Sequence, residues 1–242
     1  MEIPGFYVTG TDTGAGKTVA SAALLHALRA AGREAVGMKP VASGSTRVDG
    51  VLRSQDALLL QEASDPRPAY DDLNPYALER PLAPELAAMA EGRSVELAPL
   101  LEAFERLQAP GRTLIVEGVG GWAAPLSPTL DQADVARALR VPVVLVVGLR
   151  TGCINHARLT MRAIADDGLR VAGWIGCEVD PGMERVDESF RVVGERLAAP
   201  CWGRIPFTEP VDPAALARHV EIPDAALGLV PPGLTPPPQA PR

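Results

Sequence analysis

Short apolar runs rich in β-branched residues alternate along the chain with longer stretches in which apolar residues recur at helical spacing. The expected strands are FYVTG, EAVGMK, TLIVEG, VPVVLVVG, RVAGWIGC and WGRIP, and helices are expected over 17–31, 155–168 and 184–197. This alternation is typical of a parallel sheet. Continuously apolar strands indicate that helices cover both faces of the sheet. The pattern therefore predicts a three-layer α/β fold whose functional residues lie at the carboxyl ends of strands.

The stretch 41–112 breaks this regularity. Prolines divide it into short helices and loops, among them Pro66, Pro68, Pro75, Pro81 and Pro84. We expect it to cover a site rather than to form a second domain. One domain is predicted over 1–230, because a chain of 242 residues that is 47% hydrophobic can build one large core. Six of the last twelve residues, 231–242, are proline, so this tail is expected to be disordered.

Charge and composition narrow the classes of function. The net charge is −7 and no basic run occurs, which argues against nucleic acid or an acidic membrane as partner. The longest apolar run, 141–149, is too short to span a bilayer, and no signal peptide is recognised, so we expect a soluble cytoplasmic protein. The cysteines, Cys153, Cys177 and Cys201, form no CxxC pair and are expected to be buried free thiols.

A glycine-rich segment, TGTDTGAGKT at 9–18, stands between the first apolar run and the first helix. It resembles a P-loop, in which backbone N–H groups and a helix N-terminus face phosphates. The strict pattern would have glycine at position 11, where this chain has Thr11. Lys17 is expected to hold the β- and γ-phosphates, and Thr18 to offer its hydroxyl to Mg²⁺. Lys17 and Lys39 are the only lysines in a chain that has 21 arginines. At a phosphate, the compact ammonium of lysine is hard to replace by the planar guanidinium of arginine.

Two carboxylates complete a predicted magnesium site. Glu117 ends the apolar run TLIVE, where a Walker B acid would stand, although the usual residue there is aspartate. Asp56 opens the helical segment SQDALLLQ, and by itself it could simply be a helix-start carboxylate. Together with Thr18 they supply the oxygen ligands that Mg²⁺ prefers.

Taken together, GTDTGAGKTVASAALLHAL, KPVASGS, SQDALLLQ, NPYAL, VEGVGGW, LVVGLRTGCINHA and AGWIGCEV resemble dethiobiotin synthetases, in order and over roughly 5–210. The resemblance implies a P-loop NTPase fold and an ATP- and Mg²⁺-dependent cyclo-ligase of biotin biosynthesis. Its reaction would close 7,8-diaminononanoate and CO₂ into the cyclic urea of dethiobiotin. A homodimer with the substrate at the subunit interface is implied as well.

The same resemblance implies roles for individual residues. Lys39 and Lys17 would be catalytic, with Lys39 neutralising a carbamate and the transferring phosphoryl group and Ser43 binding the carbamate. The N-terminus of the helix after TGCINHA would receive the distal carboxylate of the substrate from the partner subunit. Nucleotide contacts are implied for Gly14, Ala15, Gly16, Lys17, Thr18, Val19, Asp56, Glu117, Gly118, Val119, Gly120, Cys177, Glu178, Pro206, Phe207 and Thr208, and substrate contacts for Thr11, Ser43, Gly152, Cys153, Ile154 and Asn155.

One departure from the family concerns the base of the nucleotide, and a second is Gly14, where some relatives have glutamate. Cys177 stands where relatives often have an asparagine that reads adenine, and a thiol is only a weak hydrogen-bonding group. ATP is the expected nucleotide, with other nucleoside triphosphates as candidates. Trp122 either walls the substrate site or packs in the core, whereas Trp174 and Trp202 are assigned to the core.

Two other classes of protein are candidates because they share the P-loop motif. A partitioning or regulatory ATPase would carry a signature lysine five residues before Lys17, and here that position is Asp12. An ATP-dependent amidoligase of cofactor synthesis is the second alternative. The length leaves no room for a glutaminase domain, so such a ligase would need ammonia from another chain.

Overall fold

The computed structural model describes residues 5–228, so the tail predicted for 231–242 lies outside the described residues. A parallel sheet of six strands has the order β12-β11-β10-β1-β7-β2. Each of the six runs predicted as a strand is one of them: β1 (Gly5–Gly10), β2 (Ala35–Met38), β7 (Thr113–Glu117), β10 (Val143–Leu149), β11 (Val171–Glu178) and β12 (Cys201–Ile205). The predicted parallel sheet is therefore confirmed.

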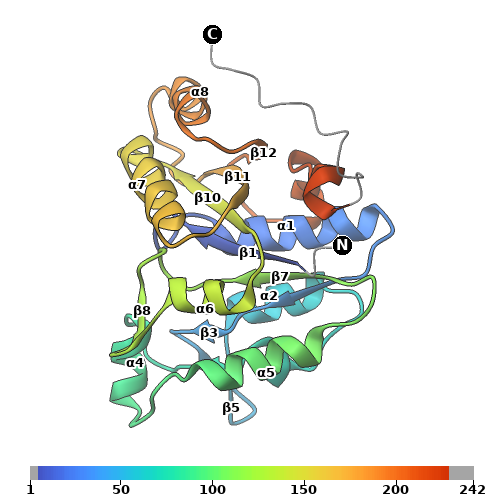
Figure 1. The fold of residues 1–242 in the computed structure, drawn as a ribbon, viewed down its shortest axis with the longest axis vertical. Coiled ribbons are helices and arrows are strands. Elements are labelled where there is room, and N and C mark those ends of the chain that lie inside the picture. The colour runs from blue at the N-terminus through green and yellow to red at the C-terminus, as the bar shows by residue number, and fades with distance from the viewer. Residues whose placement is uncertain (1–4, 229–242) are drawn as a thin grey trace.

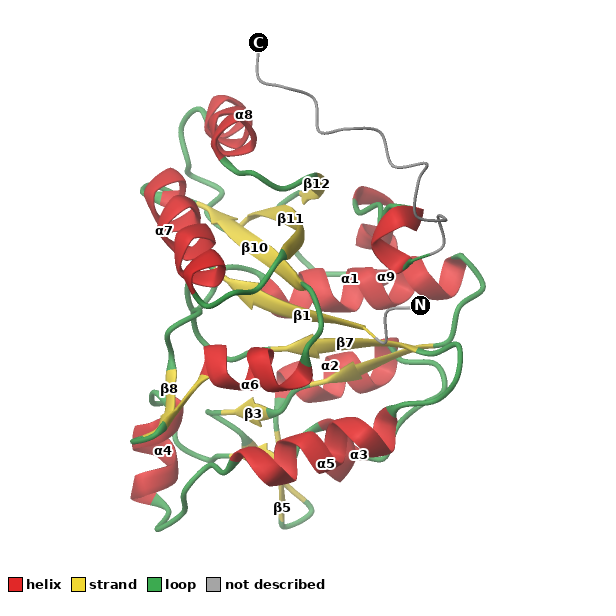
Figure 2. Cartoon of the chain, viewed as in Figure 1, coloured by secondary structure: helices red, strands yellow, loops and turns green. Residues whose placement is uncertain are grey.

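Helices cover both faces of this sheet (Figures 1 and 2). One face packs against α1 (Lys17–Ala30), α2 (Gln55–Ala63) and α9 (Pro213–Leu216), followed by the short 3₁₀ helices η1 (Ala217–His219) and η2 (Asp224–Leu227). The other face packs against α5 (Leu97–Leu107), α6 (Gln132–Leu139), α7 (Cys153–Asp166) and α8 (Val186–Arg196). The three-layer prediction is confirmed. No helix among residues 5–228 is both long and apolar enough to cross a membrane.

Apart from α2 and α5, the proline-rich stretch 41–112 folds into small elements beside the β2 end of the sheet (Figure 1). It contains the pair β3 (Val41–Ala42) and β6 (Tyr76–Ala77), the hairpin β4 (Thr46–Val48) and β5 (Val51–Arg53), and the short helices α3 (Tyr70–Leu73) and α4 (Pro84–Ala90). A second hairpin, β8 (Pro125–Ser127) and β9 (Leu130–Asp131), follows β7. These elements lie near the carboxyl ends of β2 and β7, where they can shape a site.

The core contains all three tryptophans. Trp174 and Trp202 are buried, as predicted, and Trp122 is also buried and packs edge to face against Tyr7. The prediction for the thiols is wrong at one position, because Cys201 is exposed while Cys153 and Cys177 are buried. Cys201 begins the edge strand β12, so its side chain has no further strand beside it.

Candidate functional site

The glycine-rich loop joins β1 to α1 at the carboxyl edge of the sheet. Gly16, the residue before α1, has φ +89°, and a Cβ added there would lie 2.7 Å from the Cβ of Cys177 on the neighbouring β11. Both the left-handed backbone and the close approach demand glycine. Thr11 fixes the start of the loop, since its N–H donates to the carbonyl of Val146 at 3.0 Å. The loop is thus held in a conformation that a phosphate can enter.

Lys17 lies inside this loop with its ammonium against carbonyl groups. Its Nζ donates to the backbone oxygens of Asp12 at 2.9 Å and Gly120 at 2.6 Å. Burial, followed by the positive charge of Lys39, lowers the pKa of Lys17 to about 8. Backbone carbonyls carry only partial charges, so this ammonium lacks a full counter-charge until an anion arrives.

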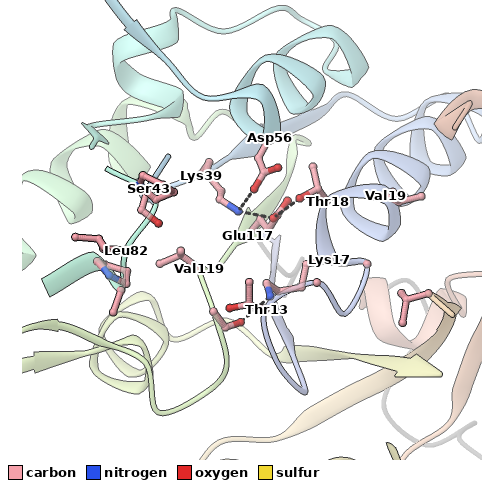
Figure 3. Close-up of a pocket in the computed structure, with 17 residues that line it drawn as sticks. Thr13, Lys17, Thr18, Val19, Lys39, Ser43, Asp56, Leu82, Glu117 and Val119 are labelled. Atoms are coloured by element: carbon pink, nitrogen blue, oxygen red, sulfur yellow. Dashed lines mark hydrogen bonds and ion pairs between the residues drawn. The ribbon is translucent and has the colours of Figure 1, made fainter. Parts of the chain in front are cut away.

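Lys39 has the opposite surroundings. It follows β2, which pairs with β7 so that Met38 is opposite Val116, and the next residues along the two strands, Lys39 and Glu117, come together. The Nζ of Lys39 lies 2.5 Å from Oε1 of Glu117 and 2.8 Å from Oδ2 of Asp56 (Figure 3). Burial by itself would lower the pKa of Lys39, but the two carboxylates outweigh burial and raise it. The protein therefore holds this lysine as a cation.

Oxygen donors converge on the same point from three elements. Thr18 of α1 donates its hydroxyl to Oε1 of Glu117 at 2.8 Å, and Asp56 stands in the first turn of α2. Oε2 of Glu117 is buried and has no hydrogen-bond partner among the described residues. An orphaned carboxylate oxygen beside a hydroxyl and a second carboxylate fits a hard divalent cation such as Mg²⁺. No group of three or more His, Cys, Asp or Glu residues within 5–228 could hold a metal, so phosphate or water oxygens would have to complete the shell.

A cavity of about 890 Å³ contains both lysines. Eleven of the residues predicted from the sequence line it: Gly14, Gly16, Lys17, Thr18, Val19, Lys39, Ser43, Asp56, Glu117, Val119 and Gly120. Figure 3 shows Ser43 and Leu82 on one side of Lys39 and Thr18 on the other. The sequence analysis missed Thr13, Val179 and the wall formed by 81–84. The prolines Pro81 and Pro84 had signalled a loop there but no chemistry.

The other predicted residues fall into two further cavities. A cavity of about 230 Å³ adjoins the first through Gly16 and Val19 and includes all the residues proposed to contact the base: Cys177, Glu178, Pro206, Phe207 and Thr208. Burial raises the pKa of the Cys177 thiol to about 12, so this thiol stays neutral. Gly152, Cys153, Ile154 and Asn155 line a separate cavity of about 440 Å³ at the N-terminus of α7.

Three predicted residues line none of these cavities. Thr11 and Ala15 belong to the body of the glycine-rich loop, and Gly118 lies below it with its carbonyl 3.5 Å from Nζ of Lys39. A Cβ at Gly118 would lie 2.9 Å from the hydroxyl of Tyr7, so glycine is needed for packing. Thr11 accepts a hydrogen bond from the N–H of Gly148 at 3.3 Å, which is a role within the loop.

Behind the cavity, buried side chains that sequence reasoning did not select hold the segment 118–122. The hydroxyl of Tyr7 donates to Gln132, whose amide donates to the carbonyl of Val119 at 2.9 Å. The indole N–H of Trp122 donates to Asp167 at 2.7 Å. A tyrosine inside an apolar strand gave no signal in the sequence, because its partner lies 125 residues further along the chain.

Comparisons with known proteins relate most of the chain to one family. A family model described as an AAA domain matches residues 4–215. The ATP-dependent dethiobiotin synthetase BioD of Xanthomonas oryzae pv. oryzae is 62% identical over 223 residues, which are 92% of this chain and 100% of that protein. The protein of the same name from Xylella fastidiosa is 56% identical and covers 91% of this chain and 98% of its own length.

Solved structures resemble the chain in fold only. A ParA family ATPase from Chlorobium tepidum has a TM-score of 0.50 at 13% identity and covers 90% of this chain and 91% of its own. The signal recognition particle receptor FtsY from Elizabethkingia anophelis has a TM-score of 0.53 at 13% identity, with 95% and 63% covered. The fold is therefore that of the P-loop NTPases. Identity above one half over nearly the whole of both chains narrows this to one family of ligases, and the chain belongs to the ATP-dependent dethiobiotin synthetases.

Proposed function

We propose that this protein forms the ureido ring of dethiobiotin from 7,8-diaminononanoate, CO₂ and ATP. The observation that supports the proposal most strongly is that one cavity contains a P-loop lysine, Lys17, and a second, permanently charged lysine, Lys39, with the Ser43 hydroxyl nearby. A nucleotide switch needs the first of these groups only. A second cation and a hydroxyl beyond the phosphates suit an enzyme that joins an anionic substrate to the γ-phosphate.

The first step places negative charge beside Lys39. One neutral amine of the substrate adds to CO₂ and loses a proton, which gives a carbamate whose oxygen then attacks the γ-phosphorus of ATP and releases ADP. Lys39 neutralises the carbamate, Ser43 donates its hydroxyl to it, and Lys17 holds the β- and γ-phosphates in line. The second amine attacks the carbonyl carbon of the resulting carbamic-phosphoric anhydride, so a second C–N bond forms and phosphate leaves.

We assign Thr18, Asp56 and Glu117 to Mg²⁺. When bound, the ion would neutralise part of the negative charge of the phosphates. The same two carboxylates bind Nζ of Lys39. The donor set, two carboxylates and one hydroxyl, and the unpartnered Oε2 of Glu117 support this assignment.

We infer that the enzyme works as a homodimer and place its reaction in the cytoplasm, where ATP is made. The cavity at the N-terminus of α7, lined by Gly152 and Asn155, shares no lining residue with the cavity of Lys39. Backbone amides at the start of a helix of 14 residues suit the distal carboxylate of the substrate. A second copy could bring this helix end to the Lys39 cavity and bind the substrate from its other end.

The test is ATP hydrolysis by the purified protein with Mg²⁺ and bicarbonate, with and without 7,8-diaminononanoate, while mass spectrometry follows dethiobiotin. We expect hydrolysis that depends on the diamine and equals the cyclic urea formed. Bicarbonate-free buffer is the matched control, since it removes one substrate and leaves nucleotide binding intact. Hydrolysis that ignores the diamine and yields no urea would indicate a regulatory ATPase or a ligase for another substrate.

A further inference from the structure

The cavity of about 230 Å³ beside the P-loop has mostly apolar walls. They come from Val179, Ile205, Pro206, Val211 and Leu216 and suit the faces of a flat ring. Gly16 and Val19 line this cavity as well as the large one. A ligand with phosphates at the P-loop can therefore place its base here. Two side chains that line this cavity, those of Glu178 and Thr208, carry oxygen atoms that can bind the edge of a ring.

The carboxylate of Glu178 is fixed in one orientation. Nε of Arg204 donates to Oε1 at 2.7 Å, and the same guanidinium also bonds Asp187 at 2.6 Å. Oε2 receives only a long contact, 3.5 Å, from the N–H of Phe207. An ionised carboxylate has about four acceptor positions, so Oε2 keeps acceptor capacity that no described residue uses. The hydroxyl oxygen of Thr208 is buried and likewise has no partner among residues 5–228.

The carboxylate of Glu178 and the hydroxyl of Thr208 differ in which bases they can distinguish. A hydroxyl both donates and accepts, so Thr208 can bond to any base. An ionised carboxylate only accepts, and the ring edge of adenine offers one exocyclic donor, its 6-amino group. Cys177 cannot take over this role, because its thiol is buried against Gly16, 3.8 Å from the carbonyl oxygen of that glycine.

We propose that Glu178, oriented by Arg204, accepts a hydrogen bond from the 6-amino group of adenine and so favours ATP over a purine nucleotide that lacks this group. The proposal rests on the proposed function, in which the phosphates of ATP occupy the P-loop. It assigns specificity to a charged side chain at the carboxyl end of β11, next to the position where an asparagine was expected to act. Arg204 is a positioning residue, since it touches the carboxylate and does not line the cavity.

The test is isothermal titration calorimetry of the full chain with Mg²⁺ and either ATP or purine riboside triphosphate, which differs from ATP only in having hydrogen in place of the 6-amino group. A hydrogen bond to a charged group predicts that ATP binds about 10- to 100-fold more tightly. In Glu178→Leu, which keeps the approximate size of the side chain, this ratio should fall to about one. The wild-type comparison needs no variant, so it stands even if Glu178→Leu folds poorly.

Asp187→Asn is the matched control, because Asp187 bonds the same arginine but is exposed and does not line the cavity. It should keep the wild-type ratio. A ratio near one in the wild type, or an unchanged ratio in Glu178→Leu, would overturn the proposal. The proposed function is tested separately by formation of dethiobiotin. A wild type that discriminates between the two nucleotides but makes no dethiobiotin would keep the reading of adenine and refute the ligase.

Discussion

Replacing Lys39 by methionine removes the ammonium that contacts the buried carboxylate of Glu117 while keeping the approximate length of the side chain. Glu117 is 0% exposed and Lys39 is 2% exposed, so water cannot replace the lost charge. Removing one member of a buried ion pair, so that the other charge stays buried and unpaired, lowers the free energy of unfolding by about 3–5 kcal/mol. The Asp56 side chain is 46% exposed and should contribute little to this loss.

Urea unfolding in EDTA, without nucleotide, measures this loss of stability at pH 7. Arg47→Met is the matched control, because it breaks the exposed ion pair between Arg47 and Glu79 and should cost under about 1 kcal/mol. Millimolar Mg²⁺ should stabilise Lys39→Met more than the wild type, since a divalent cation can replace the ammonium between the carboxylates. Turnover of Lys39→Met, measured separately with ATP and millimolar Mg²⁺, should be lost. A variant as stable as the wild type at pH 7 would refute the buried pair as a determinant of stability, and full turnover would refute the role of Lys39 in charge neutralisation.

Three further predictions, one on pH and two on substitutions, concern the nucleotide site. The pKa of Lys17 is about 8, and the negative charge of bound phosphates should raise it, so ATP binding should take up a proton and weaken as pH rises through 8. Calorimetry in buffers of different ionisation enthalpy measures this proton uptake, and the absence of uptake at pH 8.5 would contradict the prediction. Thr18→Val should weaken Mg²⁺–ATP binding about 10-fold, because it removes one oxygen ligand of Mg²⁺ and a hydrogen bond to Glu117. An unchanged affinity in a binding titration would refute the assignment of Thr18 to the metal. Cys177→Asn should sharpen the preference for ATP over other triphosphates in competition binding, since it places an amide at the wall of the smaller cavity. An unaltered ratio of the nucleotide affinities would show that neighbouring residues, and not position 177, recognise the base.

The sheet could be predicted because its strands are apolar on both faces. Runs such as Val143–Leu149 have no polar interruption, so they could only be buried strands between layers. The stretch 41–112 could not be predicted in the same way. Its elements, such as β3 with β6 and the helix α4, are short, and they are held by contacts with the rest of the fold rather than by a periodic pattern.

The residues of the site could be selected from the sequence, but their mutual arrangement could not. Lys39 was predicted to meet the substrate, and Glu117 and Asp56 the metal, as separate roles. Nothing in the sequence shows that β2 pairs with β7, and this pairing joins Lys39 to Glu117 across 78 residues. The ion pair is therefore a consequence of strand order, which local patterns do not encode.

The arrangement also accounts for why the chain retains two lysines in a composition that otherwise uses arginine. Lys39 is surrounded by carboxylates that raise its pKa, whereas Lys17 is surrounded by backbone carbonyls and has a pKa of about 8. An arginine at position 17 would remain charged at any physiological pH, and its planar fork is larger than the two-carbonyl niche that holds Nζ. The charge of Lys17 is thus stabilised by the incoming phosphates and that of Lys39 by the protein, so one lysine responds to the nucleotide while the other offers an anionic substrate a constant partner.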